Sequence, residues 1–194
     1  MRTRLDEELR EMNKEMLKMA ALCEKAISCA DKALLSQERE QAEIAIDLQE
    51  DFKQKEKNLE NLCLKILLLE QPMALDLRQV SAALKMITDL RRIGEIAGDM
   101  GDIIRYLNDE DHLEYLTSMA SSASSMVTNA INAFVQKDVN LARKVISSDD
   151  IIDDLFLEER NEIIAIYYEN IGDHAVNLAE WVIYFLTGNR ERES

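Results

Sequence analysis

Residues that break helices are scarce in this chain. Among its 194 residues there are five glycines and one proline, whereas 47% of the residues are hydrophobic. A sheet protein of this length needs many turns, and tight turns draw on glycine and proline. Their scarcity, together with plentiful Ala, Leu, Glu, Lys and Met, argues against a β-rich fold and predicts an all-α protein with a sizeable core.

Positive charge is also in short supply. The chain carries 23 Lys and Arg against 38 Asp and Glu, which gives a formal net charge of −15. Binding to nucleic acid depends on clustered basic residues at phosphates, and attraction to anionic lipid depends on basic patches. The acidic balance therefore argues against both, and it suits a protein that binds cations or basic patches on a partner.

Several other signals are absent. No apolar run approaches the roughly 20 residues that span a bilayer. The first eight residues are too acidic for a signal peptide. The three cysteines, Cys23, Cys29 and Cys63, form no Cys-x-x-Cys pair. We therefore expect reduced thiols at helix interfaces of a cytoplasmic protein that is not inserted in a membrane.

The segment Glu169–Asn177 is the most informative part of the chain. It has the spacing of a helix, because small or apolar residues recur three and four apart, at Ala165, Tyr168, Gly172, Ala175, Ala179 and Val182. Gly172 lies on this stripe, where a missing side chain lets a second helix approach. Glu169 and Asp173 are four residues apart, so their like charges lie on one face and repel, which a bound cation would offset.

A second copy of this pattern occurs earlier. The segment 89–99 aligns with 167–177 without a gap, and Ile93-Gly94-Glu95 lies over Ile171-Gly172-Asp173. The chain is therefore an internal duplication. We expect an antiparallel three-helix bundle in each half, residues 1–108 and 112–188, followed by a frayed tail at 189–194.

The helices of the first half are expected at about 4–35, 37–70 and 75–107, with Ser36 as a cap and a turn at Gln71 and Pro72. In the second half we expect three helices. One begins near residues 112–116 and includes the serine-rich segment 121–125, one begins near Asp138, and the last ends near Gly188.

The two halves differ in length. Ala42 aligns with Ala142, an offset of 100 residues, whereas Ile93 aligns with Ile171, an offset of 78. The second half therefore lacks about 22 residues between Asp154 and Ile163. Either its bundle is truncated or the sequence omits a loop, and we favour a missing loop near Phe156.

Three segments resemble the signature sequences of the PhoU family of phosphate-uptake regulators. They are Leu5–Leu9, Gln71–Arg78 and the run from Ile171 through Glu180 into Trp181–Tyr184. The resemblance implies two three-helix bundles, a homodimer, and metal bound through Glu/Asp-x-x-x-Asp motifs, two in each bundle. It also implies a cytoplasmic negative regulator that contacts the ATPase of a phosphate ABC transporter, a sensor histidine kinase, or both.

In the second half, Asp149 and Asp153 form another carboxylate pair. On antiparallel helices they would face Glu169 and Asp173. Such a cage of hard oxygen ligands suits Mg²⁺, Mn²⁺, Ca²⁺ or iron. From spacing alone, a solvated acidic face is the more common explanation. The family resemblance implies that Asp149, Asp153, Glu169 and Asp173 hold a divalent or trivalent metal: Fe, Mn, Mg or Zn.

The first half departs from this pattern. By the two offsets, the four positions carry Gln49, Lys53, Arg91 and Glu95, so one carboxylate remains of four. We expect a site without metal here, in which Lys53 or Arg91 pairs with Glu95 and supplies the positive charge of a metal.

Nothing in the sequence indicates catalysis. There is no Glu-x-x-His pair of a di-iron oxidase and no glycine-rich phosphate cradle. His174 could be an outer-shell donor, a ligand or an ordinary helix-interface histidine. We therefore expect a regulator that acts through protein–protein contact and is not an enzyme. The alternatives are an accessory subunit of a low-affinity phosphate transporter and a metal-free helical adaptor.

Overall fold

The computed structural model describes residues 2–36, 38–104, 113–158 and 163–190, and every element within them is helical. The elements are α1 (Arg2–Ser36), α2 (Arg39–Lys65), the π-helical turn η1 (Ile66–Glu70), α3 (Leu75–Ile104), α4 (Leu113–Gln136), α5 (Val139–Ser147), α6 (Asp149–Glu158) and α7 (Ile163–Thr187). The predicted all-α class is confirmed.

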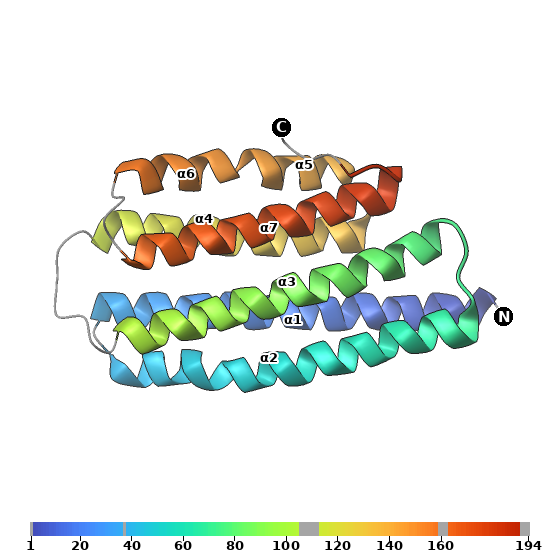
Figure 1. Ribbon diagram of the computed structural model, residues 1–194, viewed down its shortest axis with the longest axis horizontal. Coiled ribbons are helices and arrows are strands. Elements are labelled where there is room, and N and C mark those ends of the chain that lie inside the picture. The colour runs from blue at the N-terminus through green and yellow to red at the C-terminus, as the bar shows by residue number, and fades with distance from the viewer. Residues whose placement is uncertain (1, 37, 105–112, 159–162, 191–194) are drawn as a thin grey trace.

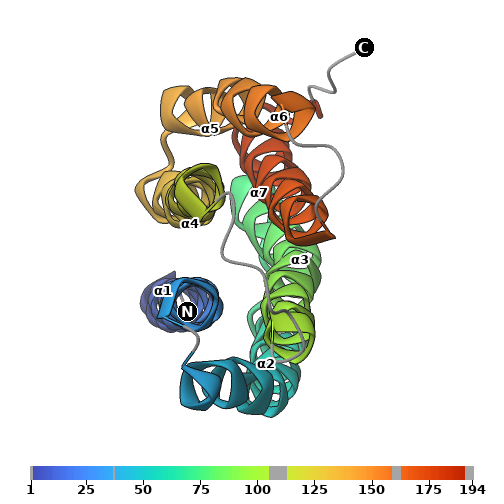
Figure 2. The ribbon, with the colours of Figure 1, turned by 90° about the vertical axis from the view of Figure 1, so that its left-hand side faces the viewer.

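The helices run roughly along one long axis and form two groups, α1–α3 and α4–α7 (Figure 1). Seen along that axis, α1 lies beside α4 and α3 beside α7, whereas α2 and the α5–α6 pair lie at the two outer ends (Figure 2). This arrangement confirms the prediction of two three-helix bundles, with α5 and α6 sharing the place of one helix.

The repeated motif faces the core in both halves. The stripe predicted on α7 is buried at all six of its positions, and so is the matching seam on α3 at Ala83, Ile87, Leu90, Gly94, Ala97, Gly101 and Ile104. Each large aliphatic side chain buried there contributes about 1.5–3 kcal/mol through removal of its surface from water. The 3,4 spacing therefore sets which face of each helix packs inward.

Glycine lets a neighbouring helix come close at the same place in each repeat. A Cβ atom added to Gly94 would lie 2.2 Å from the ring of Phe52, and one added to Gly172 would lie 3.0 Å from Cδ1 of Ile152. Phe52 and Ile152 are 100 residues apart, and the glycines are 78 apart. The contacts therefore repeat at the two offsets found in the sequence.

Several predicted helix ends are confirmed. Gln71, which precedes Pro72, has left-handed backbone geometry (φ 48°) and follows the end of α2 and η1. Asp138 caps α5, because its Oδ1 accepts hydrogen bonds from the backbone of Asn140 (2.9 Å) and Leu141 (3.1 Å). Gly188, with φ 84°, follows the last residue of α7. The serine-rich segment 121–125 lies within α4, as expected.

Two predicted details are wrong. Ser36 does not cap α2, because its hydroxyl donates backwards to the carbonyl of Lys32. The helix expected after Asp138 is broken into α5 and α6 at Ser148. The hydroxyls of Ser147 and Ser148 donate to the carbonyl of Lys144 (3.1 and 2.7 Å), a local bond that bends helices and competes with their ladder.

The second bundle has the shorter hairpin. Phe156, near which we expected a missing loop, lies within α6, which ends at Glu158, and α7 begins at Ile163. The hairpin of α2, η1 and α3 extends past the end of the second bundle (Figure 1). Residues 105–112, which include the predicted boundary between the halves, and residues 159–162 lie outside the described part.

The start of the predicted tail is held in place. Arg190 forms an ion pair with Glu180 (2.7 Å) and lies over the ring of Trp181, 4.3 Å from its centroid. Residues 191–194 lie outside the described part. Among the described helices, none combines the length and the apolar character that a membrane crossing requires.

Candidate functional site

The carboxylates predicted as metal ligands lie on two neighbouring helices. Asp149 and Asp153 are on α6, and Glu169 and Asp173 are on α7, against which α6 packs. Gly172 permits the close approach, because a Cβ atom there would lie only 3.1 Å from Oδ1 of Asp149. The antiparallel arrangement inferred from the sequence therefore brings acidic side chains of both helices into one region.

Two carboxyl groups in this region, those of Glu169 and Asp173, have raised pKa values. Burial, and then the charges of Asp173 and Asp153, raise the pKa of Glu169. Burial, and then the charge of Asp153, raise the pKa of Asp173. His174 lowers that pKa, but by less. In the part of the chain that the structure describes, neither Glu169 nor Asp173 forms an ion pair with a lysine or arginine. The cluster thus has the chemistry of a cation site: oxygen donors with an excess of negative charge.

The cluster is not a preformed cage. Among the described residues, no three His, Cys, Asp or Glu side chains are grouped closely enough to hold one metal ion. A bound cation would have to draw the carboxylates of α6 and α7 together. The residue types therefore fit a hard metal, although the side-chain positions do not impose one.

Of the three roles considered for His174, the structure supports that of a residue at a helix interface. Its Nδ1 lies 2.9 Å from Oδ1 of Asp89 on α3, so the contact joins the two bundles. The contact links residues 85 positions apart in the chain and occupies the side of the imidazole that faces α3.

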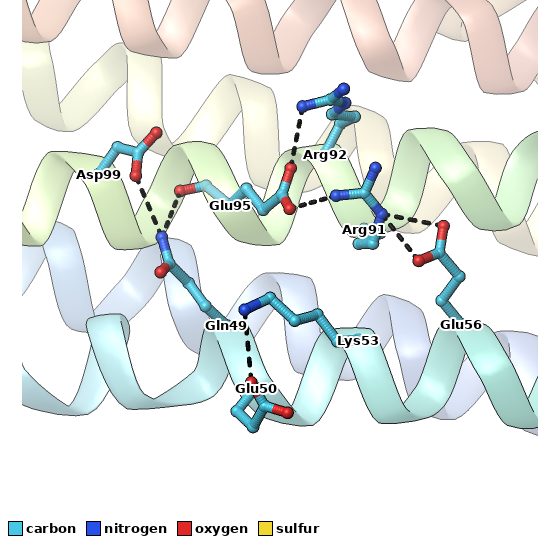
Figure 3. Close-up of polar contacts among 8 residues, drawn as sticks. All are labelled: Gln49, Glu50, Lys53, Glu56, Arg91, Arg92, Glu95 and Asp99. Atoms are coloured by element: carbon cyan, nitrogen blue, oxygen red, sulfur yellow. Dashed lines mark hydrogen bonds and ion pairs between the residues drawn. The ribbon is translucent and has the colours of Figure 1, made fainter.

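The corresponding region of the first bundle is closed by ion pairs (Figure 3). Arg91 donates to Glu56 (2.9 Å) and to Glu95, one turn along α3. Glu95 also accepts from Arg92 at 3.1 Å. The prediction that a cation of the chain pairs with Glu95 is confirmed for Arg91. It is wrong for Lys53, which pairs with Glu50 at 3.3 Å.

Gln49 also bridges α2 and α3 in this region of the first bundle. Its amide donates to the carbonyl of Glu95 (3.0 Å) and to Oδ1 of Asp99 (3.1 Å), bridging α2 and α3 (Figure 3). The bridge depends on Gly98, since a Cβ atom there would lie 2.3 Å from Nε2 of Gln49. Amide and guanidinium groups thus occupy positions where the second bundle has carboxylates.

One buried charged residue was not anticipated. Glu180 on α7 is only 7% exposed, and its carboxylate accepts hydrogen bonds from Arg190. The signal in the sequence is a glutamate inside an otherwise apolar run. Its partner lies beyond the end of the helix, where the pattern of α7 gives no information.

Comparison with known proteins places the chain in a family. The model of the PhoU domain matches residues 16–104 and 116–167. The phosphate-specific transport system accessory protein PhoU homologue of Clostridium acetobutylicum is 29% identical over 208 residues, covering 95% of each chain. The homologue of Aquifex aeolicus is 32% identical over 170 residues, which cover 86% of this chain and 77% of that one.

Solved structures agree with this assignment. The crystal structure of PhoU from Pseudomonas aeruginosa has a TM-score of 0.85 at 28% identity and covers 95% of this chain and 99% of that one. A PhoU structure from Streptococcus pneumoniae shares the fold, with a TM-score of 0.87 at 24% identity. The 208 aligned residues of the Clostridium homologue exceed the 194 of this chain, so that homologue has residues that this chain lacks. The chain belongs to the PhoU family.

Proposed function

We propose that this protein is a cytoplasmic accessory regulator of phosphate-specific transport that restrains phosphate uptake and phosphate-responsive signalling. The observation that supports it most is the match, over 95% of this chain, to a Clostridium protein described as a phosphate-specific transport system accessory protein. The partners would be the transporter's ATPase, a sensor histidine kinase, or both, with the protein itself a homodimer.

The proposed mechanism is contact between folded surfaces. The described helices form an extended scaffold, and the family is one of accessory proteins, so no reaction is assigned to it. A scaffold of this kind regulates by binding one state of its partner more tightly than another, which shifts the partner's equilibrium.

The proposal includes a metal ion in the second bundle. The residues that would hold it are Asp149, Asp153, Glu169 and Asp173, with Fe, Mn, Mg or Zn as the ion. The support is the raised pKa of Glu169 and of Asp173, which burial and then neighbouring carboxylates cause, while neither residue forms an ion pair with a lysine or arginine of the described part. When bound, the ion would supply positive charge and join α6 to α7. Arg91 supplies such charge within the first bundle.

A metal-free adaptor is the second candidate. It is favoured by one observation, that no three potential ligands within the described residues are grouped to hold an ion. In that case the acidic cluster would be a charged face that contacts a basic partner.

The test of the proposed function is deletion of the gene in its own organism, with measurement of phosphate uptake in phosphate-rich medium. We expect uptake and phosphate-starvation signalling to rise and the wild-type gene to restore them. Unchanged uptake and signalling would contradict the proposal. Co-purification with a low-affinity transporter, and not with the phosphate ABC transporter, would favour the accessory-subunit alternative.

A further inference from the structure

Exposed hydrophobic side chains gather at one end of the molecule. Six of the eleven large hydrophobic residues that are exposed in the described part lie within the segment 64–77, which we call the hairpin tip: Leu64, Leu68, Leu69, Met73, Leu75 and Leu77. Leu68 and Met73 are 75% and 78% exposed. A concentration of exposed apolar side chains in one segment is typical of interaction sites on proteins that are otherwise polar outside.

The backbone of the hairpin tip is unusual as well. The α-helical ladder of α2 gives way to the π-helical turn η1, and then Gln71 (φ 48°) and Ala74 (φ 49°) adopt left-handed geometry. Left-handed geometry costs a residue with a side chain about 1–2 kcal/mol. A turn under this strain that also exposes leucines is hard to explain by the stability of the fold alone.

Two charged side chains of the hairpin tip, Lys65 and Glu70, form ion pairs within the protein. Arg4 pairs with Glu70 (2.9 Å), and Lys65 pairs with Glu8 (2.5 Å). Arg78 donates to the carbonyl of Phe185 at the end of α7 (3.0 Å). This bond to a neutral carbonyl does not cancel the charge of Arg78, but the net charge of −15 repels both phosphate and anionic lipid.

The position of the hairpin tip suits insertion. It extends past the ends of α5 and α7 that lie on the same side, whereas α6 ends and α7 begins at the opposite end of the molecule (Figure 1). Leu68 and Met73, the most exposed side chains of the tip, are therefore open to a partner, although Arg78 contacts the end of α7.

We propose that the hairpin tip inserts into an uncharged apolar groove on a protein of the phosphate-transport apparatus, with Leu68 and Met73 as its main contacts. This inference rests on the proposed function and names the surface that performs it. An uncharged groove is the complement of the tip, because buried apolar anchors dominate binding energy when no unpaired charge is buried with them.

The test uses the organism's phosphate transporter reconstituted in nanodiscs of neutral lipid. The tip variant carries Leu68→Gln and Met73→Gln, and the control carries Leu17→Gln and Leu35→Gln. The control residues are exposed by 40% and 41% and lie on α1. Since Leu68 and Met73 are largely in water, the tip variant should unfold like the wild type, and the control, whose side chains are partly buried, should unfold only slightly earlier. We expect the tip variant to bind about tenfold or more weakly and the control within about twofold of the wild type.

The outcomes separate the inference from the proposed function. No binding of the wild type to the transporter would contradict the part of the proposed function that names the transporter, and the inference with it. Equal binding by the wild type and the tip variant would contradict the inference alone. Two further results would also overturn it, each with transporter binding unchanged. They are a tip variant that alters oligomeric state in light scattering, and one that alters flotation with vesicles of anionic lipid.

Discussion

Arg91 forms an ion pair with Glu95 one turn away on α3, and the residues at the matching positions of α7 are Glu169 and Asp173. At these two matching helix positions, the first repeat therefore has a basic and an acidic residue, whereas the second repeat has two acidic residues. The first pair is internally neutral, whereas in the second pair burial raises the pKa of both carboxyl groups, with a further contribution to both from the charge of Asp153. This difference is the basis of the asymmetry that we propose between the bundles.

Replacing Arg91 by alanine should lower the free energy of unfolding by about 1–2 kcal/mol, because Glu56 and Glu95 lose their shared partner in a partly buried place. Arg92→Ala is the matched control, since the Arg92 side chain is 57% exposed and that of Arg91 only 16%. The control should change stability by less than about 0.5 kcal/mol. Equal losses in urea denaturation would show that Arg91 has no special role.

The acidic cluster should make the metal-free protein less stable as the pH rises. Raised pKa values mean that the folded state binds protons at Glu169 and Asp173 more tightly than the unfolded chain does. Stability from this source therefore increases as the pH falls from neutral through those raised values, and it levels off below the values of the unfolded chain.

The variant Asp153→Asn removes a charge that contributes to both shifts. In chelator it should be more stable than the wild type at pH about 7, and the difference should shrink as the pH falls towards about 4 and Glu169 and Asp173 take up protons. Thermal unfolding across this range measures the effect. A difference that stays constant with pH would mean that Asp153 does not interact with the other two.

The two matching glycines should respond unequally to alanine. At Gly94 the added methyl would overlap the fully buried ring of Phe52, and we expect a loss of about 3 kcal/mol. At Gly172 it would meet the flexible end of Ile152 at 3.0 Å. There the gain in helix propensity, about 1 kcal/mol, should offset most of the cost. Calorimetry compares the two variants, and a larger loss at Gly172 would refute the packing described.

Arg190 should contribute to stability although it follows the last helix. Without its guanidinium, Glu180 would be a buried carboxylate with no charge partner, and Arg190→Ala should cost about 1–2 kcal/mol. Adding Glu180→Gln to that variant should recover part of the loss, because a neutral amide is less costly to bury. A double variant as unstable as the single one would indicate that Arg190 acts through Trp181 and not through Glu180.

Local patterns predicted most of the fold because helical spacing and turn chemistry act over short distances. The buried seams of α3 and α7, the turn at Gln71 and the start of a helix near Asp138 all followed from neighbours within a few residues. The pairing of Arg91 with Glu95 could be predicted for the same reason, because the two residues lie four positions apart on one helix face.

Contacts between distant parts of the chain could not be predicted from such local patterns. The pairing of His174 with Asp89 spans 85 residues and depends on how α3 lies beside α7. The break at Ser148 was missed because serine occurs in intact helices as well, as it does in α4. Lys53 pairs with Glu50 and not with Glu95. Its long side chain can reach more than one carboxylate, and the spacing of residues in the sequence does not show which one it contacts.

The central claim is that the second bundle binds a metal through α6 and α7 while the first does not. The most direct measurement is elemental analysis of protein purified without chelator, for the wild type and for the double variant Asp149→Asn, Asp153→Asn. We expect stoichiometric metal in the wild type and its loss in the variant, with the helical content of both unchanged. Metal retained in the variant, or none in the wild type, would contradict the claim.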